Sequence, residues 1–424
     1  MSRHLLVLVL LAAACGTPDV APPPADELAG DGKADGVRGV GVAATHLEVE
    51  LSARRATARI ELERAGDVTL EAGGLHVTRV SDRSGDRSYT LRGGALHVRD
   101  VRGDLTVEYG FDVHDHADGL LGGGSTVTWP YFCGNLFPCH SQPEDGQRFS
   151  LSLRGAPAGQ SIVAPSEIDA DAPPYMLAWA VGDYQHKQLG STAAGTEVSV
   201  YWLARGERPA TTGTAHLVEI FDWYEQVIGP YAFGDKVAAV SVVWGEGMYG
   251  GMEHHPFWHV ARDAMNDPVT HAHEAAHGWF GDGIRLRCWE DFVLSEGTVT
   301  YLAARATGQV EGADAEAKVW REYQRELDDA IAEGGAPAWP RGCNQIDILK
   351  DKLFTNLPYM EGAFFYKDVA AQVGADRLDG VLHDFYLAHA GEAAGMQQMV
   401  DAIRRDTGFD PSPLVEARLR RKFK

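Results

Sequence analysis

The stretch HEAAHGWFGDGIRLRCWEDFVLSEG, residues 273–297, determines how the rest of this 424-residue sequence is interpreted. It holds two histidines four positions apart, His273 and His277, with Glu274 between them, and 18 residues separate His277 from Glu296. On an α-helix, residues four apart lie about 40° from each other around the axis, so the two imidazoles can share one metal ion. Glu274 is rotated by about 100° from His273 and would flank that ion instead of binding it.

Glu296 completes a ligand set that suits zinc. Neutral imidazoles and a carboxylate bind Zn²⁺ at about 2.0–2.2 Å, and a catalytic site combines three protein ligands with one open position. The bare pattern of two histidines and a glutamate also occurs by chance, and Glu296 alone would be a solvated residue at the start of a helix. The combination, set in helical patterns, favours a catalytic zinc site with one ion per chain.

Outside this stretch the sequence divides into two kinds of pattern. Short alternating runs such as HLEVEL, TARIEL and DLTVEYGF, punctuated by Gly and Asp, extend over 39–205 and predict an antiparallel β domain. Over 206–424 helical apolar spacing predominates, as in AHLVEIFDWYEQVIG, and VAAVSVVW is a candidate buried strand. The expected fold is therefore α+β and multidomain, with the metal motif in the mainly helical second domain.

The N-terminus has the pattern of an export signal. Arg3 and His4 precede the apolar run LLVLVLLAAA, which is too short to span a bilayer, and LAAAC resembles a bacterial lipobox. Residues 1–15 are therefore expected to be a lipoprotein-type signal peptide that ends at Cys15, whose lipid anchor would hold the protein at the outer membrane or cell surface. An ordinary cleaved signal, with a periplasmic or secreted product, is the alternative.

The segment after the signal, 16–38, is rich in Pro, Gly, Ala and Asp and is expected to be a flexible linker. No later run of the sequence is long and apolar enough for a transmembrane helix. The lipid is therefore the only expected contact with a membrane. The formal net charge of −22 argues against nucleic acid as a partner.

Apart from the lipobox residue, four cysteines remain: Cys133, Cys139, Cys288 and Cys343. An even number in an exported protein favours two disulfides, for which three connectivities are possible. The pairing Cys133–Cys139 with Cys288–Cys343 is favoured because it keeps each bridge within one expected domain. A zinc site made of these cysteines is the alternative, although their spacing contains no CxxC pair.

Four segments, in order along the chain, resemble the motifs of a known family. They are LFPCHSQPEDGQRFSLSL at 136–153, YGGMEHHP at 249–256, the zinc motif at 273–301 and NLPYMEGAFF at 356–365. They are similar to the Pro-Cys-x-Asp-x-Pro, Gly-x-Met-Glu-Asn, HExxH and Tyr-x-Lys-Gly segments of the aminopeptidase N-like gluzincins, a zinc metallopeptidase family that includes leukotriene hydrolase. The resemblance implies a thermolysin-like catalytic domain behind an N-terminal β domain.

The resemblance also implies the catalytic roles. His273, His277 and Glu296 would bind zinc. Glu274 would act as general base toward the attacking water and then as proton donor to the leaving amine. Tyr359 would donate its phenol proton to the developing oxyanion.

A second group of residues is implied to bind the substrate, a peptide with a free N-terminus. Glu253 would pair with the α-ammonium group, which makes the implied activity that of an aminopeptidase. Gly250 and Gly251 would let the backbone run close beside the peptide. Met252 would lie near the pocket for the first side chain.

The sequence departs from the family pattern in places that concern the substrate. VTWP, 127–130, occupies the place of the family's Gln-x-Glu, which helps to hold the substrate amine. Glu361 stands in place of the Lys of Tyr-x-Lys-Gly and is expected to change the charge beside Tyr359. Two alternatives therefore stay open: a same-fold endopeptidase or hydrolase with another substrate, and a zinc-binding module that has lost catalysis.

Overall fold

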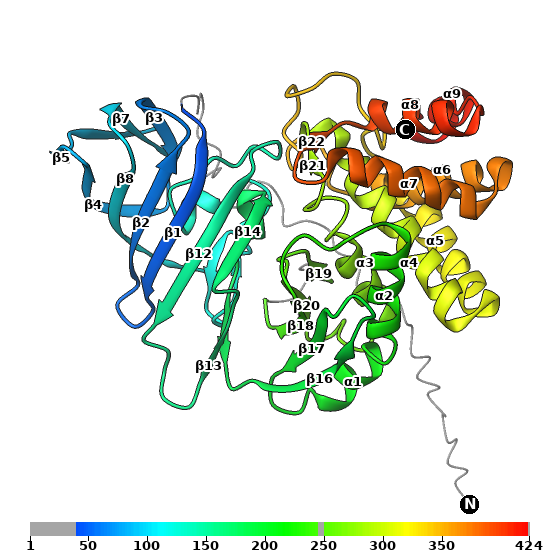
Figure 1. Cartoon of the computed structure of the whole chain (residues 1–424), viewed down its shortest axis with the longest axis horizontal. Helices are drawn as coiled ribbons and strands as arrows, with labels where there is room; N and C mark the ends of the chain where they lie inside the picture. The colour runs from blue at the N-terminus through cyan, green and yellow to red at the C-terminus, as the bar shows by residue number, and fades with distance from the viewer. Residues whose placement is uncertain (1–39, 245–249, 423–424) are drawn as a thin grey trace, which may run out of the picture.

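The computed structural model describes residues 40–244 and 250–422. The predicted signal peptide, Cys15 and the predicted linker lie outside the described residues. A β-rich half comes first in the chain, and a mainly helical half follows and lies beside it (Figure 1). The predicted fold class, a β domain followed by a mainly helical domain, is confirmed.

The β-rich half is built around a seven-stranded sheet. In spatial order its strands are β14 (Glu167–Ala172), β12 (Gln147–Arg154), β1 (Val42–Glu50), β2 (Arg55–Leu62), β8 (Leu105–Phe111), β4 (Leu75–Asp82) and β5 (Gly85–Asp86). Strand β8 shows why the alternating runs form strands: Leu105, Val107, Tyr109 and Phe111 are buried, and the residues between them are partly exposed. Neighbouring strands are antiparallel except β1 and β12, which are parallel.

Three small sheets complete this half. Their strands are β3 (Gly66–Glu71), β7 (Ala95–Val101) and β6 (Tyr89–Arg92) in one, β11 (Thr126–Val127), β10 (Gly119–Leu121) and β9 (Val113–His114) in the second, and β13 (Ser161–Val163) with β15 (Ala180–Gly182) in the third. Leu70 and Val98 of the β3–β7–β6 sheet share one hydrophobic core with Ile60 and Val107 of the large sheet. Burial of this shared face is what holds the sheets together.

The helical half begins with a sheet of its own. Its strands, in spatial order, are β16 (Gln185–Ser191), β17 (Glu197–Trp202), β18 (Lys236–Val242), β20 (Phe257–Ala261) and β19 (Gly251–Met252). The run VAAVSVVW forms the central strand β18 of this sheet, and six of its seven residues are buried. Because β16 and β17 pair with this sheet although they precede residue 205, we propose that the two halves meet near residue 183.

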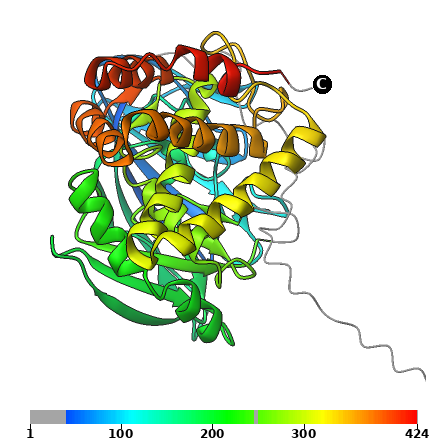
Figure 2. The same ribbon diagram turned by 90° about the vertical axis from the view of Figure 1, so that its right-hand side faces the viewer.

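Helices share a hydrophobic core with this sheet and form most of the helical half. In Figure 2 the yellow and orange helices lie in front of the blue strands of the β-rich half. They are α1 (Glu207–Gly213), α2 (Leu217–Val227), α3 (Pro268–Ala276), α4 (Phe292–Glu311), α5 (Ala313–Glu333), α6 (Asn356–Val373), α7 (Ala375–His389), α8 (Met396–Thr407) and α9 (Ser412–Leu414), with the short pair β21 (Arg285–Leu286) and β22 (Ala393–Ala394). Within residues 40–244 and 250–422, each helix is too short or too polar to cross a lipid bilayer.

Helix α4 lies at the centre of the helical half, and every residue from Phe292 to Ala304 is buried. It crosses α6 at a pair of glycines, Gly297 and Gly362. A Cβ atom built on Gly362 would lie 2.5 Å from the Cα of Gly297, and one built on Gly297 would lie 2.7 Å from the Cα of Gly362. The two backbones therefore touch, and this contact brings Glu296 of α4 and Tyr359 of α6 to the same region.

Replacing Gly362 by alanine should destabilise the protein because the added methyl group would collide with the backbone of α4. Overpacking of this kind costs about 1–3 kcal/mol, and we expect a decrease of that size in the free energy of unfolding, measured by chemical denaturation. Gly380→Ala is the matched control: Gly380 lies in α7 with no atom within 4 Å of a built Cβ. There we expect a gain of up to about 1 kcal/mol from helix propensity. If both substitutions changed the free energy of unfolding equally, the result would contradict the close contact between α4 and α6.

Candidate active site

Helix α3 carries the metal motif, and its start is set by the preceding residues Asp267 and Pro268. The carboxylate of Asp267 accepts hydrogen bonds from the backbone N–H groups of Val269 and Thr270, and Pro268 occupies the first helical position. The helix then runs through Glu274 and ends at His277. This capping fixes the rotation of α3, and with it the face on which the two histidines lie.

The structure brings His273, His277 and Glu296 together. The Nε2 atoms of the histidines are 3.3 Å apart, and Oε2 of Glu296 lies 3.1 Å from Nε2 of His273 and 3.4 Å from Nε2 of His277. When a tetrahedrally coordinated ion binds its ligand atoms at about 2.0–2.1 Å, neighbouring ligand atoms lie about 3.3 Å from each other. The three atoms therefore form a triangle of the size that zinc requires.

The environment of this triangle also favours a cation. Glu253, Glu274 and Glu296 are 4%, 5% and 4% exposed, and atoms of Glu253, Glu274 and His277 lie within 4.8 Å of one another. Burial raises the pKa of Glu253 to about 7 and raises the pKa of Glu274 well above its ordinary value. Burial also disfavours the charged form of Glu296, but the charge of His277 and the hydrogen bonds from both histidines lower its pKa to about 2. A dication placed here would favour ionisation of all three carboxyls.

Hydrogen bonds behind the histidines fix their orientation. Nδ1 of His277 donates to the carbonyl of Phe280 at 3.0 Å, which leaves Nε2 of that ring available for a metal. Nδ1 of His273 lies 3.4 Å from the hydroxyl of Thr300, one turn beyond Glu296 on α4. Nε2 of His255 donates to the backbone carbonyl of Glu274 at 2.8 Å, and burial lowers the pKa of His255 to about 3, so this histidine is neutral and structural.

Tyr359 reaches the same place from the first turns of α6, which Thr355 caps by accepting a hydrogen bond from the N–H of Leu357. Its ring is stacked on the imidazole of His273 with 5.9 Å between centroids, and the edge of Phe292 packs against it at 5.7 Å. The phenol therefore belongs to the same site as the metal ligands.

Glu361 corrects one expectation from the sequence. Side chains that are two positions apart on a helix are rotated by about 200° around its axis. Glu361 therefore faces away from Tyr359. It is 1% exposed and pairs with Arg418 at 3.3 Å. Burial raises the pKa of Glu361, and the charge of Arg418 opposes this shift. The expected change of charge beside Tyr359 is therefore wrong, because the carboxyl is bound to the C-terminal segment.

A cavity of about 610 Å³ opens onto these residues. It is lined by all seven predicted metal-binding, catalytic and substrate-binding side chains and by both predicted glycines: His273, His277, Glu296, Glu274, Tyr359, Glu253, Met252, Gly250 and Gly251. Part of its wall is apolar and includes Met252, Trp129, Phe354 and Met360. The wall is well packed, since the rings of Trp129 and Phe354 are 4.7 Å apart.

Trp129 is the site residue that sequence reasoning did not assign. The segment VTWP was noted for the absence of Gln-x-Glu, and its indole was not recognised as part of the cavity wall. Trp129 is 2% exposed and packs edge-on against Trp289 and in a tilted arrangement against Phe292. The signal that could have identified it is its position in VTWP, the segment in the approximate place of a substrate-binding motif of the family that the sequence resembles.

The two glycines before Met252 differ in what they make room for. A Cβ atom on Gly251 would lie 2.2 Å from Oε1 of Glu274 and 2.4 Å from its Cδ, whereas a Cβ on Gly250 would have no atom of the described residues within 4 Å. Gly251 therefore makes space for the carboxyl group of Glu274. The sequence-based hypothesis had attributed both glycines to the approach of the peptide.

Gly251→Ala should impair catalysis more than stability, because the methyl group displaces the carboxyl group of Glu274. A displacement of about 1 Å at a catalytic group can cost about 10²-fold in rate, and we expect a loss of kcat of that order with an almost unchanged melting temperature. Gly250→Ala is the control. Its methyl group does not displace Glu274, so kcat should stay within about a few-fold of the wild type. If the two variants had the same activity, the contact with Glu274 would have no catalytic importance.

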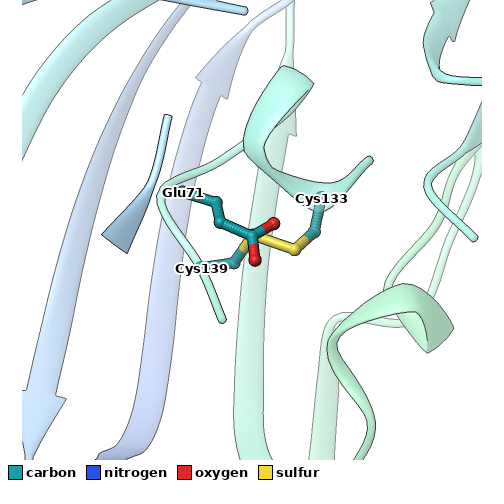
Figure 3. Close-up of side chains that lie close together, drawn as sticks. All are labelled: Glu71, Cys133 and Cys139. Atoms are coloured by element: carbon teal, nitrogen blue, oxygen red, sulfur yellow. A yellow bond between two sulfur atoms is a disulfide. The ribbon is translucent and has the colours of Figure 1, made fainter. Parts of the chain in front are cut away.

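The four cysteines form the two favoured disulfides, Cys133–Cys139 and Cys288–Cys343. Figure 3 shows the first bridge beside the carboxyl group of Glu71, whose Oε1 accepts a hydrogen bond from the hydroxyl of Ser141 at 2.6 Å. The sulfur atoms are bonded to each other, so the alternative of a zinc site made of these cysteines is wrong. The second bridge ties the segment just before α4 to the loop before α6, which carries Phe354.

Comparisons with known proteins agree with this arrangement. Residues 218–417 match the peptidase family M1 domain. The chain is 25% identical over 240 residues to leucine aminopeptidase 2 of Aspergillus niger, and 26% identical over 301 residues to leucine aminopeptidase 2 of Neosartorya fischeri. These alignments cover 52% and 63% of this chain but only 36% and 46% of the relatives, so the chain spans less than half of their length.

Solved structures share the fold. An M1 zinc metallopeptidase of Deinococcus radiodurans matches with a TM-score of 0.76 at 16% identity, over 90% of this chain and 94% of that chain. A second structure of the same protein, described as bound to a Tyr-Ser-Ala substrate, matches equally well. At this level of identity the likeness shows that both halves are arranged as in that peptidase, and it shows nothing finer.

Proposed function

Since this chain carries a peptidase family M1 domain, as its zinc motif predicted, we propose that it is a zinc-dependent aminopeptidase that removes the N-terminal residue from peptides. Leucine aminopeptidases among the relatives and a peptide-bound M1 structure support this activity. One zinc ion per chain, held by His273, His277 and Glu296, is part of the proposal.

The observation that carries the proposal is the position of Glu253. Its carboxyl group is buried and lies within 4.8 Å of atoms of Glu274 and His277. A substrate ammonium paired with Glu253 would therefore have its own carbonyl, about three bonds away, beside the metal ligands. Only the first peptide bond of a substrate can satisfy both contacts. An ammonium group would also lower the raised pKa of Glu253 and keep it ionised.

The reaction then follows from the positions of three side chains. When bound, zinc polarises the scissile carbonyl and lowers the pKa of a water molecule to about 7. Glu274 takes the proton of the attacking water and passes it to the leaving amine, and burial, which raises the pKa of Glu274, makes its carboxylate a stronger base. Tyr359, above the ring of His273, donates a hydrogen bond to the oxyanion.

Tyr359→Phe should reduce turnover without removing the metal. Loss of a single oxyanion donor costs about 10²–10³ in kcat, and the phenylalanine ring would keep the stacking on His273. If the hydrogen bond from Tyr359 to the oxyanion forms only in the transition state, we expect KM to change by less than about threefold. A fall in zinc content would instead mean that the ring supports the metal ligands.

The test of the proposal compares free and blocked substrates. The zinc-loaded protein is assayed with aminoacyl-fluorophores and with the same compounds acetylated at the nitrogen, and only the free compounds should be hydrolysed. Glu253→Gln should lower kcat/KM for the free compounds and leave the acetylated compounds unhydrolysed. Cleavage of both forms at similar rates would overturn the amine-binding role and favour a same-fold endopeptidase.

The place of action remains a prediction from the sequence. We propose that the protein acts at the bacterial cell envelope, anchored through Cys15, and that peptides in that compartment are its substrates. The two disulfides support an oxidising compartment. Labelling with a radioactive fatty acid, abolished by Cys15→Ser, would test the anchor.

A further inference from the structure

The cavity extends well beyond the residues used by the proposed reaction, along the axis of α3. At the C-terminal end of the helix it holds Glu253, Glu274 and His277, and at the N-terminal end it reaches Asp267 and then Asp263. His277 and Asp267 are ten positions apart in the sequence, which corresponds to about 15 Å along a helix. An extended peptide rises about 3.3 Å per residue, so this length accommodates roughly four residues.

We infer that a peptide whose ammonium group is at Glu253 directs its following residues toward the N-terminal end of α3, where the cavity has room for them. There the lining comes from residues 263–270 of the segment leading into α3, from the end of α4 and from α5. We call this part of the cavity the outer arm, and define it by Asp263, Glu311, Lys318, Glu322 and Glu326.

The outer arm is acidic. Among the described residues that line the whole cavity, Lys318 is the single Lys or Arg, and it lies 4.0 Å from Glu322. Arg325 is also near Glu322, at 3.6 Å. Asp263, Glu311 and Glu326 add three further carboxyl groups. Asp267 also lines the cavity, and its carboxylate caps α3.

An independent feature shows that this cavity is shaped to receive a ligand. Glu274 lines it and is 5% exposed, and its Oε2 has no hydrogen-bond partner among the described residues. A buried polar atom of this kind is normally paired. Thr270, His273 and the residues of the outer arm line the same cavity as that atom, so a ligand long enough to extend from Glu274 can contact the arm.

We propose that the outer arm selects peptides that carry Lys or Arg at the second to fourth positions. The inference rests on the proposed function, because Glu253 sets which end of the peptide enters first. The carboxylates attract the cationic side chains, while a peptide with Glu at these positions is repelled. Each exposed ion pair between the arm and the peptide contributes little binding free energy. Several such pairs together should change kcat/KM by about tenfold.

The experiment uses the full zinc-loaded chain and three tetrapeptides that share one first residue and carry two Lys, two Gln or two Glu at positions two and three. We expect kcat/KM to fall in the order Lys, Gln, Glu, and the Lys/Glu ratio to shrink at about 1 M salt, where the Debye length is about 3 Å. In the double variant Glu311→Gln/Glu326→Gln, the ratio of kcat/KM for the Lys peptide to kcat/KM for the Glu peptide should fall several-fold. A change of about that size is expected when two exposed charge pairs are lost.

The control variant is Asp329→Asn/Glu333→Gln, which removes two exposed charges of α5 that do not line the cavity. It should keep the wild-type ratio, and an equal fall in both variants would mean that only net charge matters and would overturn the proposal. Equal hydrolysis of the Lys and Glu peptides by the wild type would also overturn it.

Binding separates this proposal from the proposed function. Fluorescently labelled Lys and Glu peptides are titrated into the zinc-loaded Glu274→Gln variant, and anisotropy gives the two dissociation constants without any turnover. Tighter binding of the Lys peptide supports the outer arm even if no substrate is cleaved. Equal binding overturns it even if aminoacyl-fluorophores are hydrolysed.

Discussion

Glu274→Gln is expected to lower kcat by about 10²–10⁴-fold, the range that general acid–base catalysis supplies. The amide has the shape of the carboxyl group but accepts no proton from water. Glu274 is buried, and one of its oxygens has no hydrogen-bond partner among the described residues, so few structural contacts are lost. Because burial already raises the pKa of Glu274, a neutral amide should leave the melting temperature unchanged or slightly higher.

The measurement is kcat together with zinc content and melting temperature for the same preparation. Retained zinc with lost turnover would place Glu274 in the chemical step. Turnover within tenfold of the wild type would contradict its role as general base. Loss of zinc would show that the residue supports the metal ligands, and Gly251→Ala would then be expected to lose zinc as well.

Removal of the metal is expected to abolish activity and to lower the melting temperature. A ligand that binds only the folded protein adds about 2.7 kcal/mol of stability at a concentration 100 times its dissociation constant. Without a cation, the buried carboxyl groups of Glu253, Glu274 and Glu296 also disfavour one another's ionisation. A chelator should therefore shift the melting curve to lower temperature, and one equivalent of Zn²⁺ per chain should restore both activity and stability.

His277→Ala is the control for this experiment. The substitution removes one corner of the 3.1–3.4 Å triangle, so the variant should contain no zinc and its melting curve should not respond to the chelator. A wild-type melting curve that is unaffected by the chelator, together with unchanged activity, would contradict a zinc site at these residues.

The grouping of His273, His277 and Glu296 and the two disulfides could be predicted because their signals are local or limited to few possibilities. The four-residue spacing of His273 and His277 is a property of one helix, and four cysteines allow only three pairings. The third ligand, Glu296, was expected at the start of its helix. In the structure α4 begins at Phe292, so Glu296 lies in the second turn, because the apolar residues before it continue the buried surface of the helix.

Features that depend on distant parts of the chain could not be predicted. Strand β1 pairs in parallel with β12 about a hundred residues later, and β16 and β17 join a sheet that their alternating pattern does not identify. The outer arm draws Asp263 and Glu326 from separate elements. The net charge of the sequence says that acids are abundant, and only the fold places them along one cavity.

The aromatic wall at Trp129 has a consequence for how the molecule folds. Trp129, Tyr131 and Tyr175 come from the β-rich half, yet they belong to the hydrophobic core of the helical half, and the hydroxyl of Tyr131 accepts a hydrogen bond from the N–H of Ile348 at 2.9 Å. The two halves should therefore melt in one cooperative transition. A fragment limited to the matched residues 218–417 would leave this core open to water, and it should aggregate instead of folding.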